Sequence, residues 1–248
     1  MSRTLPPAAA ISLLLALGIA CGQDVDGLLQ QATQASQRGE HERAIDKLSE
    51  VIKASPAASI AWYLRGREQF RAGKIAESVV DFDKYVQLEP QSANQQWERG
   101  ISYYYAGEFA KGAKQFEDYQ MFHDQDVENS VWRYLCVARS SGVEKAKANL
   151  LPITEDRRVP MMQIYGLYQG KLKPEDVLAA ANANPPNPDT HNQRLFYAHL
   201  YIGLWQEAAG DAELAKKHLL EADKRKIAHY MWDVAHVHAQ RLKAAEKK

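Results

Sequence analysis

The C-terminal part of the chain contains a group of histidines, the residue type that most often binds metal ions or transfers protons. His218, His229, His236 and His238 fall within one short segment. On a helix, a step of two residues turns a side chain by about 200°, so His236 and His238 face apart. A tetrahedral zinc site needs its ligands to converge on one point. We therefore expect no metal site and no bound cofactor here.

Other catalytic patterns are incomplete or absent from the sequence. The chain has no glycine-rich phosphate loop and no G-x-S-x-G motif, and His41-Glu42 is not extended to H-E-x-x-H. The charged run Glu155-Asp156-Arg157-Arg158 lies near a break and predicts a solvated loop. These observations favour a protein that is not an enzyme.

Cys21 is the residue for which the sequence predicts covalent chemistry. Residues 1–20 form a targeting segment with a positive start at Arg3 and an apolar stretch that is too short to span a bilayer. The segment ends Leu17-Gly18-Ile19-Ala20-Cys21, which resembles a bacterial lipobox, although Gly18 stands where leucine is usual. We expect residues 1–20 to be a lipoprotein signal peptide and Cys21 to carry a lipid. The alternative is cleavage after Ala20 without lipidation.

The lipobox resemblance implies a bacterial envelope location. Gly22 follows the cysteine, and no aspartate stands there to signal retention in the inner membrane. An outer-membrane anchor, with the protein facing the periplasm, is therefore implied. Several acyl chains, at about 0.8 kcal/mol per buried methylene, would hold it stably. Cys136, the other cysteine, lies in an apolar stretch and is expected to be a buried thiol.

Step by step along the chain, residues of the same kind recur every 34 positions. Three sets share this spacing: turn glycines, small residues, and large apolar residues, namely Gly39, Gly73 and Gly107; Ala32, Gly66 and Gly100; Leu48, Phe82 and Phe116. Pro56 and Pro90 end the first two units. This period is typical of the tetratricopeptide repeat, a helical hairpin that stacks into a solenoid. The predicted fold is all-α, with an irregular middle and a C-terminal capping helix.

The repeats divide the mature chain into three segments. Residues 21–126 should hold the N-terminal repeats, and residues 127–190 should form degenerate helical hairpins, with helices at about 160–169 and 174–183. Residues 191–248 should form a further repeat, because Gly203 and Gly210 keep the seven-residue gap of Gly66 and Gly73. A last helix over about 229–245 should cover the open end of the stack.

In tetratricopeptide repeats, the first helix of each hairpin lines a concave peptide-binding groove. The matching positions here are aromatic, aliphatic or arginine: Tyr63, Arg67, Arg71, Trp97, Ile101, Tyr104 and Tyr105. Aromatic residues and arginine dominate binding hot spots, so this groove suits a peptide with apolar and acidic groups. Phe70 holds a further groove position of the second repeat. Packing between repeats is the alternative role of these side chains, above all for Phe70 and Tyr104. The clamp for a C-terminal carboxylate is not expected, because its positions hold Leu29 and Thr33.

The balance of charge argues against nucleic acid as a partner. The formal net charge is zero, whereas nucleic-acid binders carry a basic excess. Acidic residues predominate over 22–126 and basic residues over 215–248. Solvated helix faces explain this unevenness, and a dipolar scaffold with a basic end is the alternative.

The combination of Cys21, three N-terminal repeats, an irregular middle and the C-terminal stretch 201–222 resembles the NlpI-type lipoproteins. Proteins of that family are dimeric adaptors that face the periplasm and bring a processing protease together with cell-wall hydrolases. The resemblance implies an envelope-anchored adaptor that binds proteins or peptide segments and forms a homodimer. A lipoprotein for outer-membrane assembly or pilus biogenesis is one alternative. An envelope enzyme with an unrecognised site in 127–190 is another.

Overall fold

The computed structural model describes residues 25–246, which form helices joined by turns and contain no strand. The predicted all-α tetratricopeptide-repeat fold is thus confirmed. The signal peptide and the lipidation site Cys21 lie outside the described residues. Among the described helices, none combines the length and apolar character that crossing a bilayer requires.

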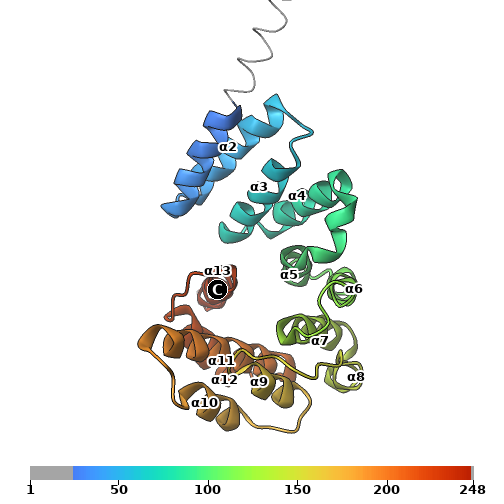
Figure 1. Ribbon diagram of the computed structural model, residues 1–248, viewed down its shortest axis with the longest axis vertical. Helices are drawn as coiled ribbons and strands as arrows, with labels where there is room; N and C mark the ends of the chain where they lie inside the picture. Colours follow the sequence, from blue (N-terminus) through green and yellow to red (C-terminus); the bar gives the residue numbers. More distant parts are fainter. Residues whose placement is uncertain (1–24, 247–248) are drawn as a thin grey trace, which may run out of the picture. The chain divides into compact units, whose positions relative to one another are not determined.

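The chain divides into two compact units, of which unit 1 ends at Pro90. Its described part consists of four helices in two hairpins (Figure 1). A helix over residues 25–37 is followed by α2 (His41–Ala54), α3 (Ser59–Arg71) and α4 (Ile75–Leu88). The short 3-10 helix η1 (Pro90–Gln95) then leads into unit 2.

Unit 2 begins at Gln91 and holds the remaining helices. In chain order they are α5 (Trp97–Tyr105), α6 (Phe109–Tyr119), α7 (Val127–Ser141), α8 (Val143–Ala148), α9 (Met161–Tyr168), α10 (Pro174–Asn182), α11 (Pro188–Ala209), α12 (Ala212–Asp223) and α13 (Tyr230–Ala245). The helices α9 and α10 lie where the sequence predicted short helices. The last repeat starts earlier than predicted, because Asn187 caps α11 by accepting a hydrogen bond from Thr190 N, with Pro188 in its first turn.

A small residue on the first helix of a hairpin faces a large residue 16 positions later on the second. A Cβ atom added to Gly100 would lie 2.7 Å from the Phe116 ring, and one added to Gly203 would lie 2.7 Å from Leu219. These separations are too short for a carbon contact, so only glycine lets the two helices approach this closely. Close approach of the partner helix therefore explains the glycine at positions 100 and 203, whereas a Cβ at Gly66 would meet Phe82 at an ordinary 3.4 Å.

The turn between the two helices of a hairpin depends on a second glycine. Gly73 and Gly210 have φ angles of +76° and +89°, a left-handed conformation that side chains with a Cβ rarely adopt. Each follows its small mid-helix residue by seven positions. The small residue sets the spacing of the helices, and the second glycine turns the chain back.

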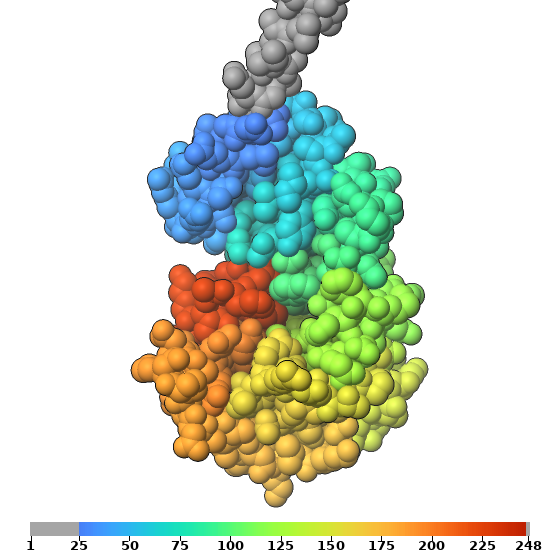
Figure 2. Space-filling view, in the orientation of Figure 1, coloured from blue at the N-terminus to red at the C-terminus, as the bar shows by residue number. Residues whose placement is uncertain are grey.

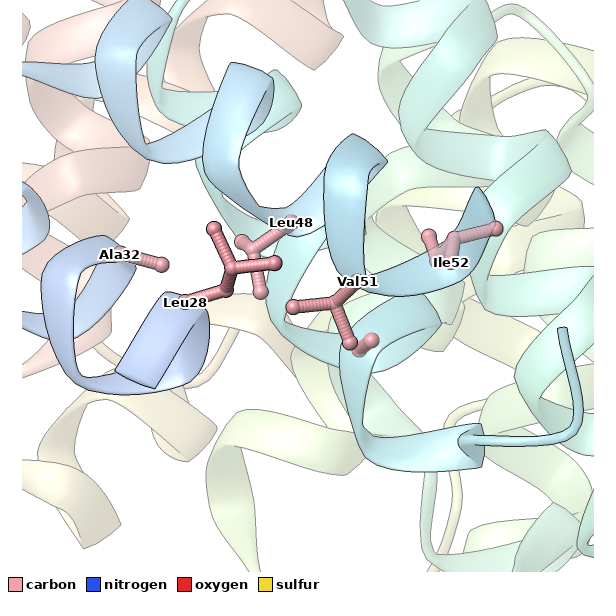
Figure 3. Close-up of a cluster of buried hydrophobic side chains, with 6 residues drawn as sticks. Leu28, Ala32, Leu48, Val51 and Ile52 are labelled. Carbon is pink, nitrogen blue, oxygen red and sulfur yellow. The ribbon is translucent and has the colours of Figure 1, made fainter. Parts of the chain in front are cut away.

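The core of unit 1 shows how the apolar positions of the repeat are used. Leu28 of the first helix lies beside Leu48 and Val51 of α2, and Ala32 and Ile52 belong to the same buried cluster (Figure 3). All five are at least nine-tenths buried. Their spacing of three or four residues places them on one face of each helix, so the hairpin buries a single apolar stripe.

The C-terminal helix α13 packs within unit 2 rather than only covering the end of the last hairpin. Its red segment lies directly against the orange segment of α12 (Figure 2). On the other side it reaches α5, where His238 is hydrogen-bonded to Tyr105. The expectation that this helix is only an end cap was therefore incomplete.

Candidate binding surfaces

In unit 1, the predicted groove residues lie on one face of α3. Tyr63, Arg67 and Arg71 follow one another at intervals of four residues and are half-buried. The Arg67 guanidinium lies 5.7 Å from the centre of the Tyr63 ring, within range of a cation–π interaction. Arg67 and Arg71 also line a cavity of about 200 Å³ with Thr33 and Ser36 of the first helix. Two basic side chains and an aromatic ring are thus gathered at one surface.

Glu68 links the helices that form this surface. Its buried carboxylate accepts hydrogen bonds from Ser36 at 2.7 Å and from Arg71 at 2.5 Å, and it lies 2.8 Å from His41 Nδ1. Burial by itself would raise the pKa of Glu68, but the hydrogen bond from His41 and the charge of Arg71 outweigh burial and lower that pKa. The ionised carboxylate therefore joins the first helix, α2 and α3.

In unit 2, three of the predicted groove residues are not available to a partner. Ile101, Tyr104 and Tyr105 are 0%, 5% and 8% exposed. Tyr104 packs edge-on against Trp132 of α7, and Tyr105 is covered by α13. The prediction that these three line an open groove is wrong, because the chain's own helices fill the space beside α5. Packing was the alternative stated for Tyr104.

Polar contacts fix α13 to α5. The Tyr105 hydroxyl is hydrogen-bonded to His238 Nδ1 at 2.9 Å, and His238 Nε2 lies 3.3 Å from Glu207 of α11. Burial would raise the pKa of Glu207, but the hydrogen bond and charge of His238 more than offset it and lower that pKa. A chain of three polar groups, in which Tyr105 and His238 are buried and Glu207 is partly exposed, thus holds the C-terminal helix in place.

The histidines that invited a search for a metal site each have their own neighbours. His236 Nδ1 lies 2.7 Å from Asp223, and His229 stacks on Trp97 with the ring centres 6.1 Å apart. His218 pairs with His199 at 2.9 Å. Within the part of the chain that the structure describes, no group of three metal-binding side chains comes together.

Trp97, the remaining predicted groove residue, is half-buried and borders a cavity of about 200 Å³ that we call the aromatic–acidic pocket. Its lining combines aromatic rings with charged and amide groups: Trp97, Phe116, Tyr119, Asp126, Glu128, Asn129, Trp132, Arg158, His229 and Met231. These residues come from α5, α6, α7, α13 and the loop before α9. Sequence reasoning identified only Trp97 of this set as a site residue.

Of the charged run before α9, Arg158 lines this pocket, and the side chain of Asp156 is buried beside it. Arg158 is hydrogen-bonded to Asp126, Glu128 and Asp156 at 2.6–2.7 Å, and the Asp156 side chain is only 4% exposed. The expectation of a solvated loop was therefore wrong for Asp156, whereas Glu155, Arg157 and Arg158 are exposed as predicted. The spacing of these residues gave no signal of the full cluster, because two of the three partners of Arg158, Asp126 and Glu128, lie 32 and 30 residues away.

Glu128 is the group most strongly perturbed in this cluster. Its side chain is 12% exposed, and it accepts a hydrogen bond of 2.5 Å from Tyr201. Burial, the largest cause, and the nearby Asp126 raise the pKa of Glu128 to about 7, against the opposing charge of Arg158. At neutral pH this carboxyl group is therefore close to its midpoint.

Cys136 is buried in α7, as predicted from its apolar surroundings. Its sulfur faces Gly112, where an added Cβ would lie only 2.8 Å away. Burial raises the pKa of the Cys136 thiol far above its ordinary value. A thiol in that state is a poor nucleophile, so its role is packing.

Comparison with known proteins gives structural neighbours only. No family model matches the chain, and no curated protein matches it. MamA from Desulfovibrio magneticus is similar at 14% identity and a TM-score of 0.49, over 82% of this chain and 94% of that one. A tetratricopeptide repeat protein from Parabacteroides merdae is similar at 13% identity and a TM-score of 0.49, over 86% of this chain and 97% of that one.

A third structure, YrrB, is described as a tetratricopeptide repeat protein with an unusual peptide-binding site. It is similar at 15% identity and a TM-score of 0.44, over 86% of this chain and 90% of that one. We take no ligand or partner for this chain from likenesses of this degree.

The raised pKa of Glu128 predicts a pH dependence of stability. Because the folded state binds this proton more tightly than the unfolded state, the stabilisation is complete below about pH 4.5 and is lost as pH rises through about 7. Glu128→Gln cannot ionise, so the variant should gain about 1–3 kcal/mol relative to the wild type between pH 5 and pH 8. Urea unfolding at several pH values measures this difference.

Glu213→Gln is the matched control, because Glu213 is exposed on α12. The difference in unfolding free energy between the Glu213→Gln variant and the wild type should stay nearly constant between pH 5 and pH 8. A Glu128→Gln offset that is equally constant between pH 5 and pH 8 would contradict a raised pKa.

Proposed function

We propose that the protein is an envelope-anchored adaptor that binds a peptide segment of another protein at the α3 surface of unit 1. Tyr63, Arg67 and Arg71 are the residues proposed to make the contact, and Cys21 the site of the lipid anchor. The ligand chemistry that suits them is an extended or helical segment with apolar and acidic side chains. Envelope proteases or cell-wall hydrolases are the partner class implied by the NlpI-type resemblance.

The observation that carries this proposal is a difference between α3 of unit 1 and α5 of unit 2, each the first helix of its hairpin. In unit 2, the face of α5 is covered by packed helices, so Ile101, Tyr104 and Tyr105 are buried. In unit 1, Arg67 and Arg71 remain half-exposed around a cavity. Aromatic and arginine side chains that are fixed in place lose little entropy on binding, which favours their use as anchors.

Rigidity of the α3 surface supports the same proposal. Glu68 holds Arg71 through a charged hydrogen bond, and Tyr63 packs against Phe82 and Tyr85 of α4 with ring centres 5.9 Å and 5.2 Å apart. The binding side chains are therefore ordered before a partner arrives. An ordered surface costs less free energy on association than a flexible one.

Anchoring is tested by Cys21→Ala. Without the thiol no lipid can be attached, and several acyl chains supply the membrane affinity. The variant should leave the membrane fraction and appear in the soluble envelope fraction, measured by fractionation and immunoblotting after a salt wash. Cys136→Ala is the control and should stay with membranes. A Cys21→Ala protein that still sediments with washed membranes would rule out the anchor.

Binding at the α3 surface is tested by placing a photo-crosslinking amino acid at position 67. Illumination of cells should yield a discrete crosslinked product, identified by mass spectrometry, because the side chain lies at the proposed contact. Arg67→Ala should weaken capture of that same partner by about 1–3 kcal/mol, the range for hot-spot residues. The matched control is a crosslinker at Glu77, an exposed residue of α4.

The control position should yield no product of that mass. Equal crosslinking at positions 67 and 77, or undiminished capture by a folded Arg67→Ala variant, would place the binding surface elsewhere.

A further inference from the structure

The aromatic–acidic pocket of unit 2 contains polar groups that the described chain leaves unsatisfied. Asn129 and Trp132 are 3% and 2% exposed, and both line the pocket. Neither Asn129 Oδ1 nor Trp132 Nε1 has a hydrogen-bond partner in the described part of the chain. Folded proteins pair nearly all buried polar groups, so each exception calls for a ligand, a water molecule or a functional reason.

The orientation of the Asn129 amide is fixed by its own hydrogen bond. Its Nδ2 donates to Gln120 Oε1 at 3.1 Å, while Gln120 Nε2 donates to the carbonyl oxygen of Asp124 at 2.9 Å. The carbonyl oxygen of Asn129 is therefore the acceptor left over. The pocket thus offers one unused acceptor, from Asn129, and one unused donor, from the Trp132 indole.

The charges at the pocket favour a cation. Asp126, Glu128 and Asp156 surround the single guanidinium of Arg158. Of these carboxylates, Asp126 and Glu128 line the pocket, and Asp156 pairs with Arg158 outside the lining. With Glu128 ionised and His229 neutral, the lining carries one more negative than positive charge. A ligand carboxylate would be repelled here, whereas a cation would be attracted by the surplus negative charge.

The walls of the pocket favour a cation with an apolar stem. Trp97, Phe116 and Trp132 present indole and phenyl rings, and Met231 adds a thioether chain. Aromatic faces attract ammonium groups, and they also pack against the methylene groups that carry such a head. The volume of about 200 Å³ matches one long side chain rather than a folded segment.

We propose that the aromatic–acidic pocket binds the side chain of a lysine within a peptide. The ammonium group lies against Asp126 and Asn129 Oδ1, and its methylene stem packs between the aromatic rings. The Trp132 indole N–H donates to a carbonyl oxygen of the same peptide. This site is separate in chemistry from the α3 surface, which suits acidic segments, and it stands without the proposed adaptor role.

The test uses the whole folded protein and small probes of defined chemistry. The probe is Nα-acetyl-lysine methylamide, compared with Nα-acetyl-norleucine methylamide, which lacks the amine, and with cadaverine, which lacks the peptide group. Binding is followed by the indole N–H resonance of Trp132 in a nitrogen-15 correlation spectrum. The lysine probe should shift this resonance in a saturable way and bind at least fivefold more tightly than either comparison compound.

Variants separate the proposed contacts from general stability. Asp126 caps α7 by accepting a hydrogen bond from Glu128 N. Asp126→Asn keeps an acceptor for that bond but loses the charge, and it should weaken binding of the lysine probe at least fivefold. Trp97→Leu removes an aromatic wall at a half-buried position and should weaken it similarly. Asp118→Asn is the matched control, because Asp118 lies on α6 outside the pocket lining, and it should leave binding unchanged.

Several results would overturn the proposal. One is the absence of a saturable shift with the lysine probe in a protein whose helical spectrum and melting are normal. Another is equal binding of the lysine and norleucine probes, which would show an apolar pocket with water at Asn129. Tighter binding of cadaverine would assign the site to free amines rather than peptides. Equal effects of Asp126→Asn and Asp118→Asn would remove the role of the pocket carboxylate.

Discussion

The fold depends on how closely the two helices of a hairpin can approach. At Gly100 and Gly203 any Cβ would collide with the large side chain 16 residues later, at a separation of 2.7 Å. The backbone of the first helix at the glycine packs against the large side chain of the second helix. A later glycine with positive φ forms the turn between the two helices. Mid-helix glycine costs about 1 kcal/mol relative to alanine, and the buried contact with Phe116 or Leu219 offsets that cost. The close distance between the two helices of a hairpin decides which side chains are buried between them and which remain exposed.

The sequence was enough to predict this part of the structure, because each position of the repeat has one mechanical role. Gly73 and Gly107 mark turns, and Phe82 and Phe116 mark the large residues of the second helices. The short helices α9 and α10 were also predictable, from a proline at the start of each and from Glu175 and Asp176 in the first turn of α10. Local patterns such as these carry information about neighbours within one helical hairpin, and the predictions succeeded at that range.

The sites were less predictable, since they depend on contacts between residues far apart in the chain. Tyr105 meets His238 across 133 positions, and Tyr201 meets Glu128 across 73. The repeat pattern places Tyr104 and Tyr105 on the face of α5 but says nothing about which segment covers that face. Arg158 likewise looked like one member of a solvated charge run. Its two distant carboxylate partners, Asp126 and Glu128, became visible only in the folded chain.

The same repeat position has different roles in the two units. In unit 1, a buried carboxylate, Glu68, holds a basic and aromatic surface in a fixed arrangement. In unit 2, the corresponding face of α5 is buried by other helices of the unit. The polar groups lie instead around the aromatic–acidic pocket, whose carboxylates outnumber its guanidinium group. Buried ionised groups of this kind are costly unless they are paired. Their arrangement is therefore more informative about function than the apolar core is.

A double-mutant cycle of Gly100→Ala and Phe116→Leu tests the steric constraint most directly. Without a collision, alanine would stabilise the helix by about 1 kcal/mol. We predict instead that Gly100→Ala destabilises by about 1–3 kcal/mol, as overpacking does, and that Phe116→Leu relieves at least about 1 kcal/mol of that cost in the double variant. Gly66→Ala, whose Cβ would meet Phe82 at an ordinary 3.4 Å, should be neutral or stabilising. A stabilising Gly100→Ala, or a cycle whose two effects simply add, would contradict the account.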